Sequence, residues 1–351
     1  MANSSLRIGQ FDTVLYNANL NPMGVPESVK KILSESIDGI GRYPADYYPG
    51  LKKAISAYTG CDEKHVVLGS GSTDLIRLFI SLVSPKKALL LTPSATEYES
   101  SLSIYGCETD YYALSEEADY RLDISDFTSR LDSSYDMVIL GNPNNPTSQI
   151  IAREDMKVIA DTCKALDIFL LIDEMYIEFT ENYRELTSTA LLSSYDNIAI
   201  LRSISKFFAV PGLRVSYGFV ANDELLNMVN IISTPNSIST LTAIACTALL
   251  KDKSYIEESG SQIFTERNLI YSAMATNKNV RLFKPYANFM LIKILKEDVT
   301  AGRLAEACNL KGMVIRKCDD FRGLDEKYVR FCFMKPTQND LLVNTMLELL
   351  S

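Results

Sequence analysis

The 351-residue sequence contains only one histidine, His65, and this limits the nucleophilic mechanisms open to the protein. A Ser-His-Asp or Cys-His mechanism would have to use this imidazole. His65 stands in DEKHVV, directly before an apolar run, where a surface histidine is the expected interpretation. We therefore do not expect catalysis by an imidazole.

Paired cysteines and basic clusters are also lacking. The seven cysteines are scattered and include no CxxC pair, which favours reduced thiols over a metal site or a disulfide framework. The 44 acidic and 35 basic residues give a formal net charge of -9, and no basic run occurs. We therefore expect no metal, no nucleic acid and no anionic membrane as partners.

Long hydrophobic runs are missing as well. The longest apolar stretches have the length of a strand, and the opening MANSSLRIGQ has no hydrophobic signal core. The hydrophobic content of 47% and the charged content of 23% are ordinary for a globular chain. These features predict a cytoplasmic protein.

Short apolar runs alternate with helical patterns through the middle of the chain. Helices are expected to begin near Ser72, Ala95 and Ala152. This alternation indicates an α/β fold whose central sheet is mostly parallel and covered by helices. The expected strands are HVVLG, ALLLTP, MVILGNP, IFLLIDE, IAILRS and VSYGFV.

The pattern changes after about residue 250. A long helix over 254–274 is followed by strands near VRLF, NFMLIKI, MVIRK and YVRFCF and by a terminal helix. This mixture predicts a smaller α+β domain. We place the large domain at 41–252, and the small domain, with an N-terminal arm, at 1–40 plus 253–351.

Polar segments follow five of the expected strands. In chain order they are GSGSTD, TPSATEY, NPNNPTS, DEMY and RSISK. Ligands of open parallel sheets bind beyond the carboxyl ends of the strands. The five segments are therefore expected to meet in one pocket.

Lys206 lies in the otherwise apolar segment SISKFFAVPGLR, after a predicted buried strand. An ammonium group is costly to bury unless its pKa falls or it is consumed chemically, and Schiff-base lysines use both routes. The alternative is a surface lysine that extends its charge into water.

Three further segments each allow two interpretations. Ser72 and Thr73 of GSGSTD could bind a phosphate at a helix start or serve as a plain N-cap. Asp173 at the end of IFLLID could pair with a cationic ring nitrogen or cap the next turn. Asn145, between the prolines of NPNNPTS, could donate to a phenolate oxygen or belong to a simple turn.

Taken in order, GSGSTD, NPNNPTS, DEMYIEF, SISKFFAVPGLR and the arginine of YVRFCF resemble the class I/II aminotransferase family. The resemblance runs from NANLNP to the last helix. It implies the pyridoxal 5'-phosphate-dependent transferase fold type I, with an amino acid as substrate. It also implies a homodimer with shared active sites.

The resemblance implies a role for each matching residue. Lys206 would form the Schiff base and move the α-proton, while Asp173 would pair with the pyridine nitrogen. Asn145 and Tyr176 would hold the 3-oxygen of the ring. Arg330 would bind the substrate carboxylate through its bidentate fork.

The remaining site residues are also implied by the resemblance. Tyr43 would reach the cofactor phosphate of the neighbouring subunit, and Asn19 of NANLNP is a candidate substrate ligand. Ala95 stands where the family places an aromatic ring over the cofactor, so Tyr98 would have to compensate. The cofactor phosphate would be bound by Ser72, Thr73, Ser203, Ser205 and Arg214.

The branch of the family is less sharply defined. NANLNPMG, RYP and MVIRK resemble both histidinol-phosphate aminotransferases and threonine-phosphate decarboxylases, and CDDFRGL favours the decarboxylases. Arg316 and Arg322 are candidates for a distal phosphate, with surface arginines as the alternative. We favour α-decarboxylation of a phosphorylated L-amino acid; an aminotransferase, a nucleotide-binding module and a catalytically silent relative remain open alternatives.

Overall fold

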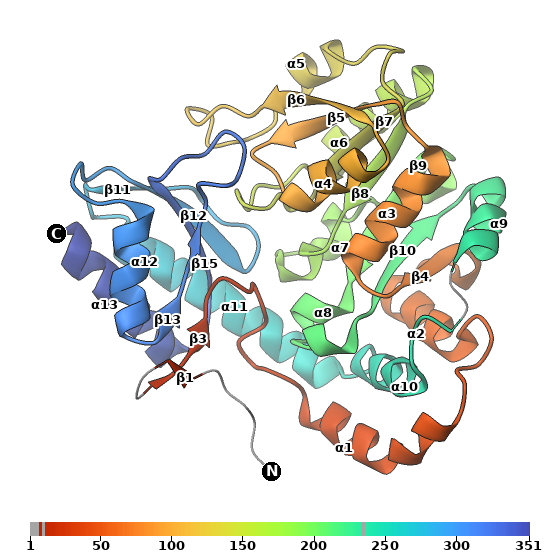
Figure 1. Ribbon diagram of the computed structural model, residues 1–351, viewed down its shortest axis with the longest axis horizontal. Helices are drawn as coiled ribbons and strands as arrows, with labels where there is room; N and C mark the ends of the chain where they lie inside the picture. The colour runs from red at the N-terminus through yellow and green to blue at the C-terminus, as the bar shows by residue number, and fades with distance from the viewer. Residues whose placement is uncertain (1–6, 9–10, 234–235) are drawn as a thin grey trace.

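The computed structural model describes residues 7–8, 11–233 and 236–351. A seven-stranded sheet forms its larger part, in the order β4-β10-β9-β8-β7-β5-β6 (Figure 1). All neighbouring pairs from β9 to β6 are parallel, whereas β10 runs antiparallel to both β4 and β9. The strands are β4 (Val66–Gly69), β5 (Lys87–Thr92), β6 (Glu108–Ala113), β7 (Met137–Gly141), β8 (Phe169–Asp173), β9 (Ile198–Ser203) and β10 (Ser216–Val220).

Helices cover both faces of this sheet because alternate strand residues point to opposite sides. Leu171 and Leu201 pack with α3, α4 and α9, whereas Ile172 and Ile200 pack with the cluster that includes α2, α5, α6 and α10. The helices are α2 (Pro49–Thr59), α3 (Ser72–Val83), α4 (Thr96–Ile104), α5 (Ile124–Ser129), α6 (Arg153–Ala165), α7 (Tyr183–Leu186), α8 (Ile204–Phe207), α9 (Asp223–Ile232) and α10 (Thr240–Leu249).

Strand β6 is not among the strands predicted from the sequence. Its residues ETDYYA include two acidic side chains, and it lies at the edge of the sheet beside β5. An edge strand needs no continuous apolar run, because one of its sides faces solvent. The mostly parallel, helix-covered sheet that the sequence predicts is the observed architecture.

The smaller part is built on a four-stranded antiparallel sheet in the order β11-β12-β15-β14. The separate strand β13 pairs in parallel with β3, so an N-terminal segment is attached to this part. The elements are β3 (Val14–Leu15), α11 (Lys253–Met274), β11 (Val280–Leu282), β12 (Phe289–Ile294), α12 (Ala301–Leu310), β13 (Met313–Val314), β14 (Arg316–Lys317), β15 (Tyr328–Cys332) and α13 (Pro336–Leu350).

The remaining N-terminal elements belong to both parts. The short strands β1 (Arg7–Ile8) and β2 (Phe11–Asp12) pair with each other, while α1 (Glu27–Glu35) packs against α10. Described residues of the N-terminal segment therefore contact both parts, and the domain boundaries remain a proposal. The 3-10 helices are η1 (Ile37–Gly41), η2 (Glu63–His65), η3 (Ile177–Phe179), η4 (Ser188–Ser193) and η5 (Pro211–Leu213).

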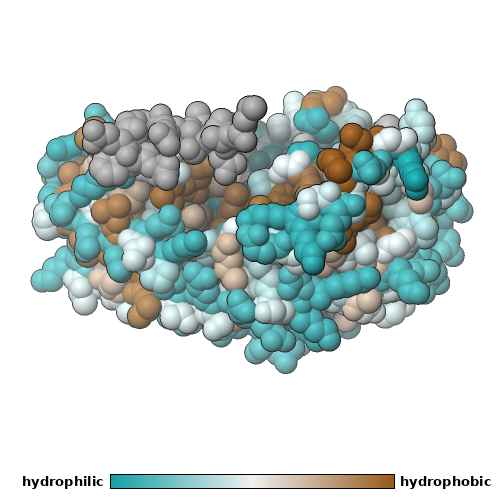
Figure 2. Space-filling view, turned by 90° about the horizontal axis from the view of Figure 1, so that it is seen from below, coloured by the Kyte–Doolittle hydropathy of each residue, from teal (hydrophilic) through white to brown (hydrophobic). Residues whose placement is uncertain are grey.

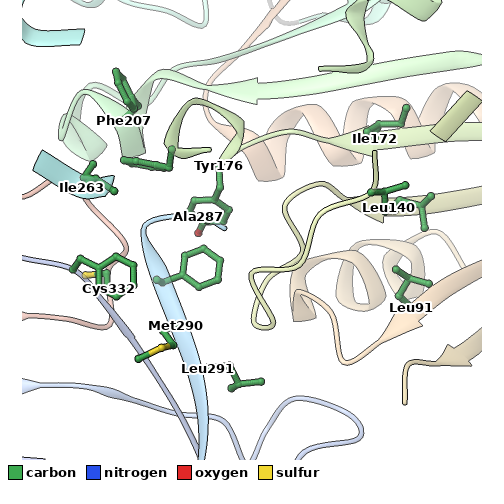
Figure 3. Packing of buried hydrophobic residues seen from close by; sticks show 14 of the residues in the cluster. Leu91, Leu140, Ile172, Tyr176, Phe207, Ile263, Ala287, Met290, Leu291 and Cys332 are labelled. Carbon is green, nitrogen blue, oxygen red and sulfur yellow. The ribbon is translucent and has the colours of Figure 1, made fainter. Parts of the chain in front are cut away.

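Hydrophobic side chains join the two parts into one continuous cluster. Figure 3 shows Tyr176, Phe207 of α8, Ile263 of α11 and Met290 of β12 in this packed region. Seen from below, where α1 lies, the surface is mainly hydrophilic with separate hydrophobic patches (Figure 2). Among the described residues, no helix is both long and apolar enough to cross a bilayer.

Candidate active site

A cavity of about 130 Å³ lies at the carboxyl ends of the large-sheet strands. Each of the five polar segments singled out in the sequence contributes at least one residue to its lining. Parallel strands bring their carboxyl ends to one edge, which explains this convergence. The lining residues are Ser72, Ile76, Ala95, Glu97, Tyr98, Pro143, Asn145, Asp173, Met175, Tyr176 and Lys206.

Lys206 extends from the short helix α8 into this cavity. Its Nζ donates to the carbonyl oxygen of Ala18 at 2.9 Å. The backbone N–H of Asn21 donates to the Lys206 carbonyl at 3.1 Å, and the Asn21 amide donates to Phe207 O at 2.7 Å. The NANLNP segment therefore fixes the helix that carries the lysine.

Asp173 ends β8 and is only 5% exposed. Burial raises its pKa to about 6, although hydrogen bonds from Tyr98 and Met175 oppose the shift. The Tyr98 hydroxyl donates to Oδ2 at 2.8 Å, and the Met175 N–H donates to Oδ1 at 2.9 Å. Because neither partner is cationic, a protonated ring nitrogen at this carboxyl would favour its ionised form.

Arg330 of β15 connects the smaller sheet to the cavity wall. Its Nη1 donates to Asn145 Oδ1, and its Nη2 donates to Asn17 O at 2.9 Å. Arg330 is 5% exposed, and among the described residues its Nε has no hydrogen-bond partner. This buried guanidinium has no carboxylate among those hydrogen-bond partners, which is an arrangement suited to binding an anionic ligand.

Asn19 and Tyr176 meet beside this arginine. The Asn19 amide donates to the Tyr176 hydroxyl at 3.4 Å, and within the described chain Asn19 Oδ1 has no hydrogen-bond partner although the residue is fully buried. The Tyr176 ring packs edge-on against Phe289, with centroids 4.9 Å apart. A buried unpaired amide oxygen indicates a place where a ligand donor can bind.

A separate group of polar residues surrounds the start of α3. Gly71 has a φ of +125°, and a Cβ there would collide with the guanidinium of Arg214. Arg214 therefore lies against the helix N-terminus formed by Ser72 and Thr73, which carries free N–H groups and a partial positive charge. Gly71 is not among the residues predicted for the site, and its only signal in the sequence is its place within GSGSTD.

Two serines lie near this group at the end of β9. Ser203 caps α8 by accepting the Ser205 N–H at 3.2 Å, and Ser216 Oγ donates to Ser203 Oγ at 3.4 Å. Ser205 Oγ donates to Val215 O at 3.4 Å. Hydroxyls, an arginine and a helix N-terminus together form a chemically suitable cradle for a phosphate.

Ala95 and Tyr98 occupy neighbouring positions at the start of α4. Ala95 is the N-cap residue and lines the cavity with no aromatic ring. Tyr98, which the sequence analysis offered as a substitute ring, directs its hydroxyl to Asp173. Met175 and Glu97 also line the cavity, and nothing in a single sequence distinguishes them from their neighbours.

Besides Asn19, Thr73, Ser203, Ser205, Arg214 and Arg330, which are described above, three more predicted residues lie outside the cavity lining. Arg316 donates to Asp320 Oδ2 at 2.6 Å, and Arg322 donates to Glu99 Oε1 at 2.8 Å. Tyr43 is 88% exposed. The cavity lining therefore brings together Ser72, Tyr98, Asn145, Asp173, Tyr176 and Lys206, whereas Arg316 and Arg322 pair with acidic side chains and Tyr43 is exposed.

The chain matches known proteins over nearly its whole length. The family model for aminotransferase class I and II covers residues 12–346. A threonine-phosphate decarboxylase of Salmonella typhimurium is 30% identical over 96% of this chain and 91% of its own length. A histidinol-phosphate aminotransferase of Methanococcus aeolicus is 28% identical over 91% of this chain and 85% of its own.

A solved structure agrees with this assignment. The histidinol-phosphate aminotransferase of Clostridium acetobutylicum superposes with a TM-score of 0.88 at 31% identity, covering 96% of this chain and 98% of that one. The cofactor of the family, pyridoxal 5'-phosphate, fits the buried Asp173 and the cradle at Gly71 and Arg214. The chain belongs to the class I and II aminotransferase family of pyridoxal 5'-phosphate-dependent enzymes of fold type I.

Proposed function

We propose that the protein removes the α-carboxylate of a phosphorylated L-amino acid such as threonine phosphate. The observation that carries the proposal is the single cavity shared by Lys206, Asp173, Asn145 and Tyr176. The similarity to a threonine-phosphate decarboxylase over 96% of the chain supports the choice of reaction. Pyridoxal 5'-phosphate supplies an electron sink for the carbon that loses the carboxylate.

Different residues of the cavity bind different parts of the cofactor. Lys206 would hold it through its amino group and would carry the proton at the α-carbon. Asp173 keeps the ring nitrogen protonated, because an ion pair in this buried place stabilises both charges. Asn145 and Tyr176 orient the 3-oxygen, and Asn19 supports the Tyr176 hydroxyl.

The cofactor phosphate binds at the start of α3. Arg214 supplies the charge there, next to Gly71, and backbone N–H groups supply the directed donors. The proposed side-chain ligands are Ser72, Thr73, Ser203, Ser205 and Arg214, joined by Tyr43 of a second subunit.

Arginines of the smaller part bind the substrate anions. Arg330 binds the α-carboxylate of the substrate. Among the described residues its Nε has no hydrogen-bond partner, and its Nη atoms donate only to neutral oxygen atoms. Arg316 lies directly opposite Arg330 in the β14–β15 ladder, so the two side chains share a face. We assign Arg316 and Arg322 to the phosphate group of the substrate. When this phosphate binds, it replaces Glu99 as the hydrogen-bond partner of Arg322.

An aminotransferase is the second candidate function. Its support is the 31% identity to the Clostridium acetobutylicum histidinol-phosphate aminotransferase. The same residues serve either reaction, because the bond that breaks is set by how the substrate is oriented over the ring. In an aminotransferase, Lys206 would remove the α-proton of the substrate, whereas in a decarboxylase it would supply a proton to the carbon that loses the carboxylate.

We also propose a cytoplasmic homodimer with shared active sites. Exposed apolar side chains gather near η1, with Ile37 53%, Ile40 72%, Tyr43 88% and Tyr47 68% exposed. Such a group is typical of a protein–protein contact.

The shared sites are tested by mixing two inactive variants. A mixture of Tyr43→Ala and Lys206→Ala chains, refolded together, should regain activity that neither variant has alone. Light scattering that shows a monomer would contradict the dimer.

The proposed function is tested by colour and product. Wild-type protein with pyridoxal 5'-phosphate should absorb visible light, and borohydride should fix the cofactor on Lys206. In a separate sample that has not been reduced, threonine phosphate should yield carbon dioxide without a 2-oxoacid. Lys206→Ala should lower turnover at least about 1000-fold. Wild-type turnover by this variant would contradict the role assigned to Lys206. Formation of a 2-oxoacid by the wild-type protein would favour the aminotransferase.

A further inference from the structure

A buried ion pair lies behind the cavity, on the other face of the large sheet. The side chains of Arg202 in β9 and Glu174 just after β8 are 1% and 0% exposed, and Arg202 Nε donates to Glu174 Oε2 at 3.0 Å. Asp173 pairs with Leu201 in the β8–β9 register. Because side chains alternate along a strand, Glu174 and Arg202 point away from the face that carries Asp173.

The carboxylate of Glu174 is held by several donors at once. Besides Arg202, it accepts the Thr187 hydroxyl at 2.7 Å and the Ser188 N–H at 2.5 Å. Arg202 Nη2 donates to the same Thr187 hydroxyl at 2.6 Å, which closes a ring of hydrogen bonds. The Glu174 N–H also donates to Leu201 O at 2.8 Å. This ring fixes the ends of β8 and β9 relative to each other.

Arg202 also reaches a second segment of the site. Its Nη1 lies 3.6 Å from Glu178 Oε1, and Glu178 belongs to η3, two residues after Tyr176. Arg202 itself stands four residues before Lys206. One guanidinium therefore contacts segments that lead directly to Asp173, Tyr176 and Lys206.

The energetic role of such a pair differs from its geometric role. Burying two charges costs desolvation energy that their attraction rarely exceeds, so apolar replacements of both are often neutral for stability. In contrast, the rate of the catalysed reaction falls strongly when an active-site group is displaced by about 1 Å. This pair lies between the ends of β8 and β9, which lead to Asp173 and to Lys206 of α8. We therefore expect it to contribute mainly to the geometry of the site.

We propose that Arg202 and Glu174 are positioning residues for the pyridoxal 5'-phosphate chemistry. They hold the ends of β8 and β9 so that Asp173 and Lys206 approach the cofactor from fixed points. Arginine suits this task because its planar fork bridges Glu174, Thr187 and Glu178 at once, which a lysine cannot do. The inference rests on the proposed roles of Lys206 and Asp173.

The test compares variants that remove the pair with one that removes another buried arginine. The double variant Arg202→Met/Glu174→Leu removes both charges, and Arg202→Lys keeps the charge but not the fork. Arg267→Met is the control, since Arg267 is 6% exposed and pairs with Glu181 at 2.6 Å, but lies on α11. Each protein is assayed for thermal unfolding without cofactor, for kcat and KM, and for the pH midpoint of the visible absorption of bound cofactor.

At about pH 5 the Glu178 carboxyl, which also loses Arg202, is protonated. At that pH the double variant should unfold near the wild-type temperature, and it should still carry the cofactor on Lys206. Its kcat should fall about 100-fold with little change in KM, and its absorption midpoint should move by about half a pH unit or more. Arg202→Lys should recover part of both losses. The control should lower the unfolding temperature and leave the midpoint unchanged.

Wild-type kcat and an unmoved midpoint in the double variant would overturn the inference. If the double variant does not fold, the Arg202→Lys variant provides the test. A pH midpoint of cofactor absorption equal to that of the wild type in this variant would also overturn the inference. Borohydride mapping of the wild-type protein is independent of these outcomes. Attachment of the cofactor away from Lys206 would refute the proposed function itself.

Discussion

Ala95 shows how much a single side chain can change the setting of the cofactor. It lines the cavity at the N-terminal end of α4, and its 8% exposure leaves it buried against that space. A methyl group offers far less stacking area to a flat ring than an aromatic side chain does. The neighbouring Tyr98 is engaged by Asp173 through its hydroxyl. The residues of this cavity would therefore hold the edges of a bound cofactor more than its faces.

We expect Ala95→Phe to strengthen cofactor binding. An aromatic contact contributes about 1 kcal/mol beyond buried area, which corresponds to about a fivefold lower dissociation constant. The constant can be measured by titrating cofactor-free protein and following visible absorption. Ala95→Leu is the control, because it adds volume without a ring. Equal effects of the two variants would show that filled space, and not stacking, is responsible.

At the scale of elements, the strands could be predicted because their apolar runs are continuous. Each polar segment after such a run lies at the predicted edge, and Lys206, Asp173 and Asn145 share the cavity. The edge strand β6 was missed because its sequence ETDYYA is partly charged. The ion pair of Arg202 and Glu174 was also missed, since only the register of β8 and β9 brings the two residues together.

The 3-10 helix η3 contains a group that makes folding stability depend on pH. Burial raises the pKa of Glu178 from 4.5 to about 7, opposed by the charge of Arg202. Because the folded state binds this proton more tightly than the unfolded state, the stabilisation is full below about pH 4.5 and is lost as the pH rises through about 7.

Glu178→Gln should remove this dependence, since glutamine resembles the protonated acid. At about pH 8 the variant should be more stable than the wild type by up to about 3 kcal/mol, and at about pH 4 the two should be similar. Urea unfolding at several pH values measures the difference. A constant difference at all pH values would contradict titration of Glu178 as the cause.

At the scale of the whole molecule, a polar cluster holds the two sheets together. Glu116, in the loop after β6, accepts Lys293 Nζ at 2.9 and 3.0 Å and the Tyr328 hydroxyl at 2.7 Å. Arg281 Nη1 also donates to Glu116 at 3.3 Å. Glu116 follows the large sheet, whereas Arg281, Lys293 and Tyr328 lie on β11, β12 and β15 of the smaller one.

We expect Glu116→Ala to destabilise the protein by about 2 kcal/mol, because several donors lose one shared acceptor. Urea unfolding measures this loss, and limited proteolysis should cut the connection between the two parts faster. Glu348→Ala is the control: its pair with Lys311 at 2.8 Å lies on the surface of the smaller part. That variant should change stability by less than about 0.5 kcal/mol; equal losses in the two would show that the cluster has no special role.

The pairing of β3 with β13 constrains the order in which the enzyme can mature. Residues near the start of the chain supply the carbonyls that receive Lys206 and Arg330, at Ala18 and Asn17. They are held in place by a strand close to the other end of the chain. During synthesis, the reaction centre cannot assemble until β13 and β15 have left the ribosome. A nascent chain that stops before β13 would present an unfinished pocket.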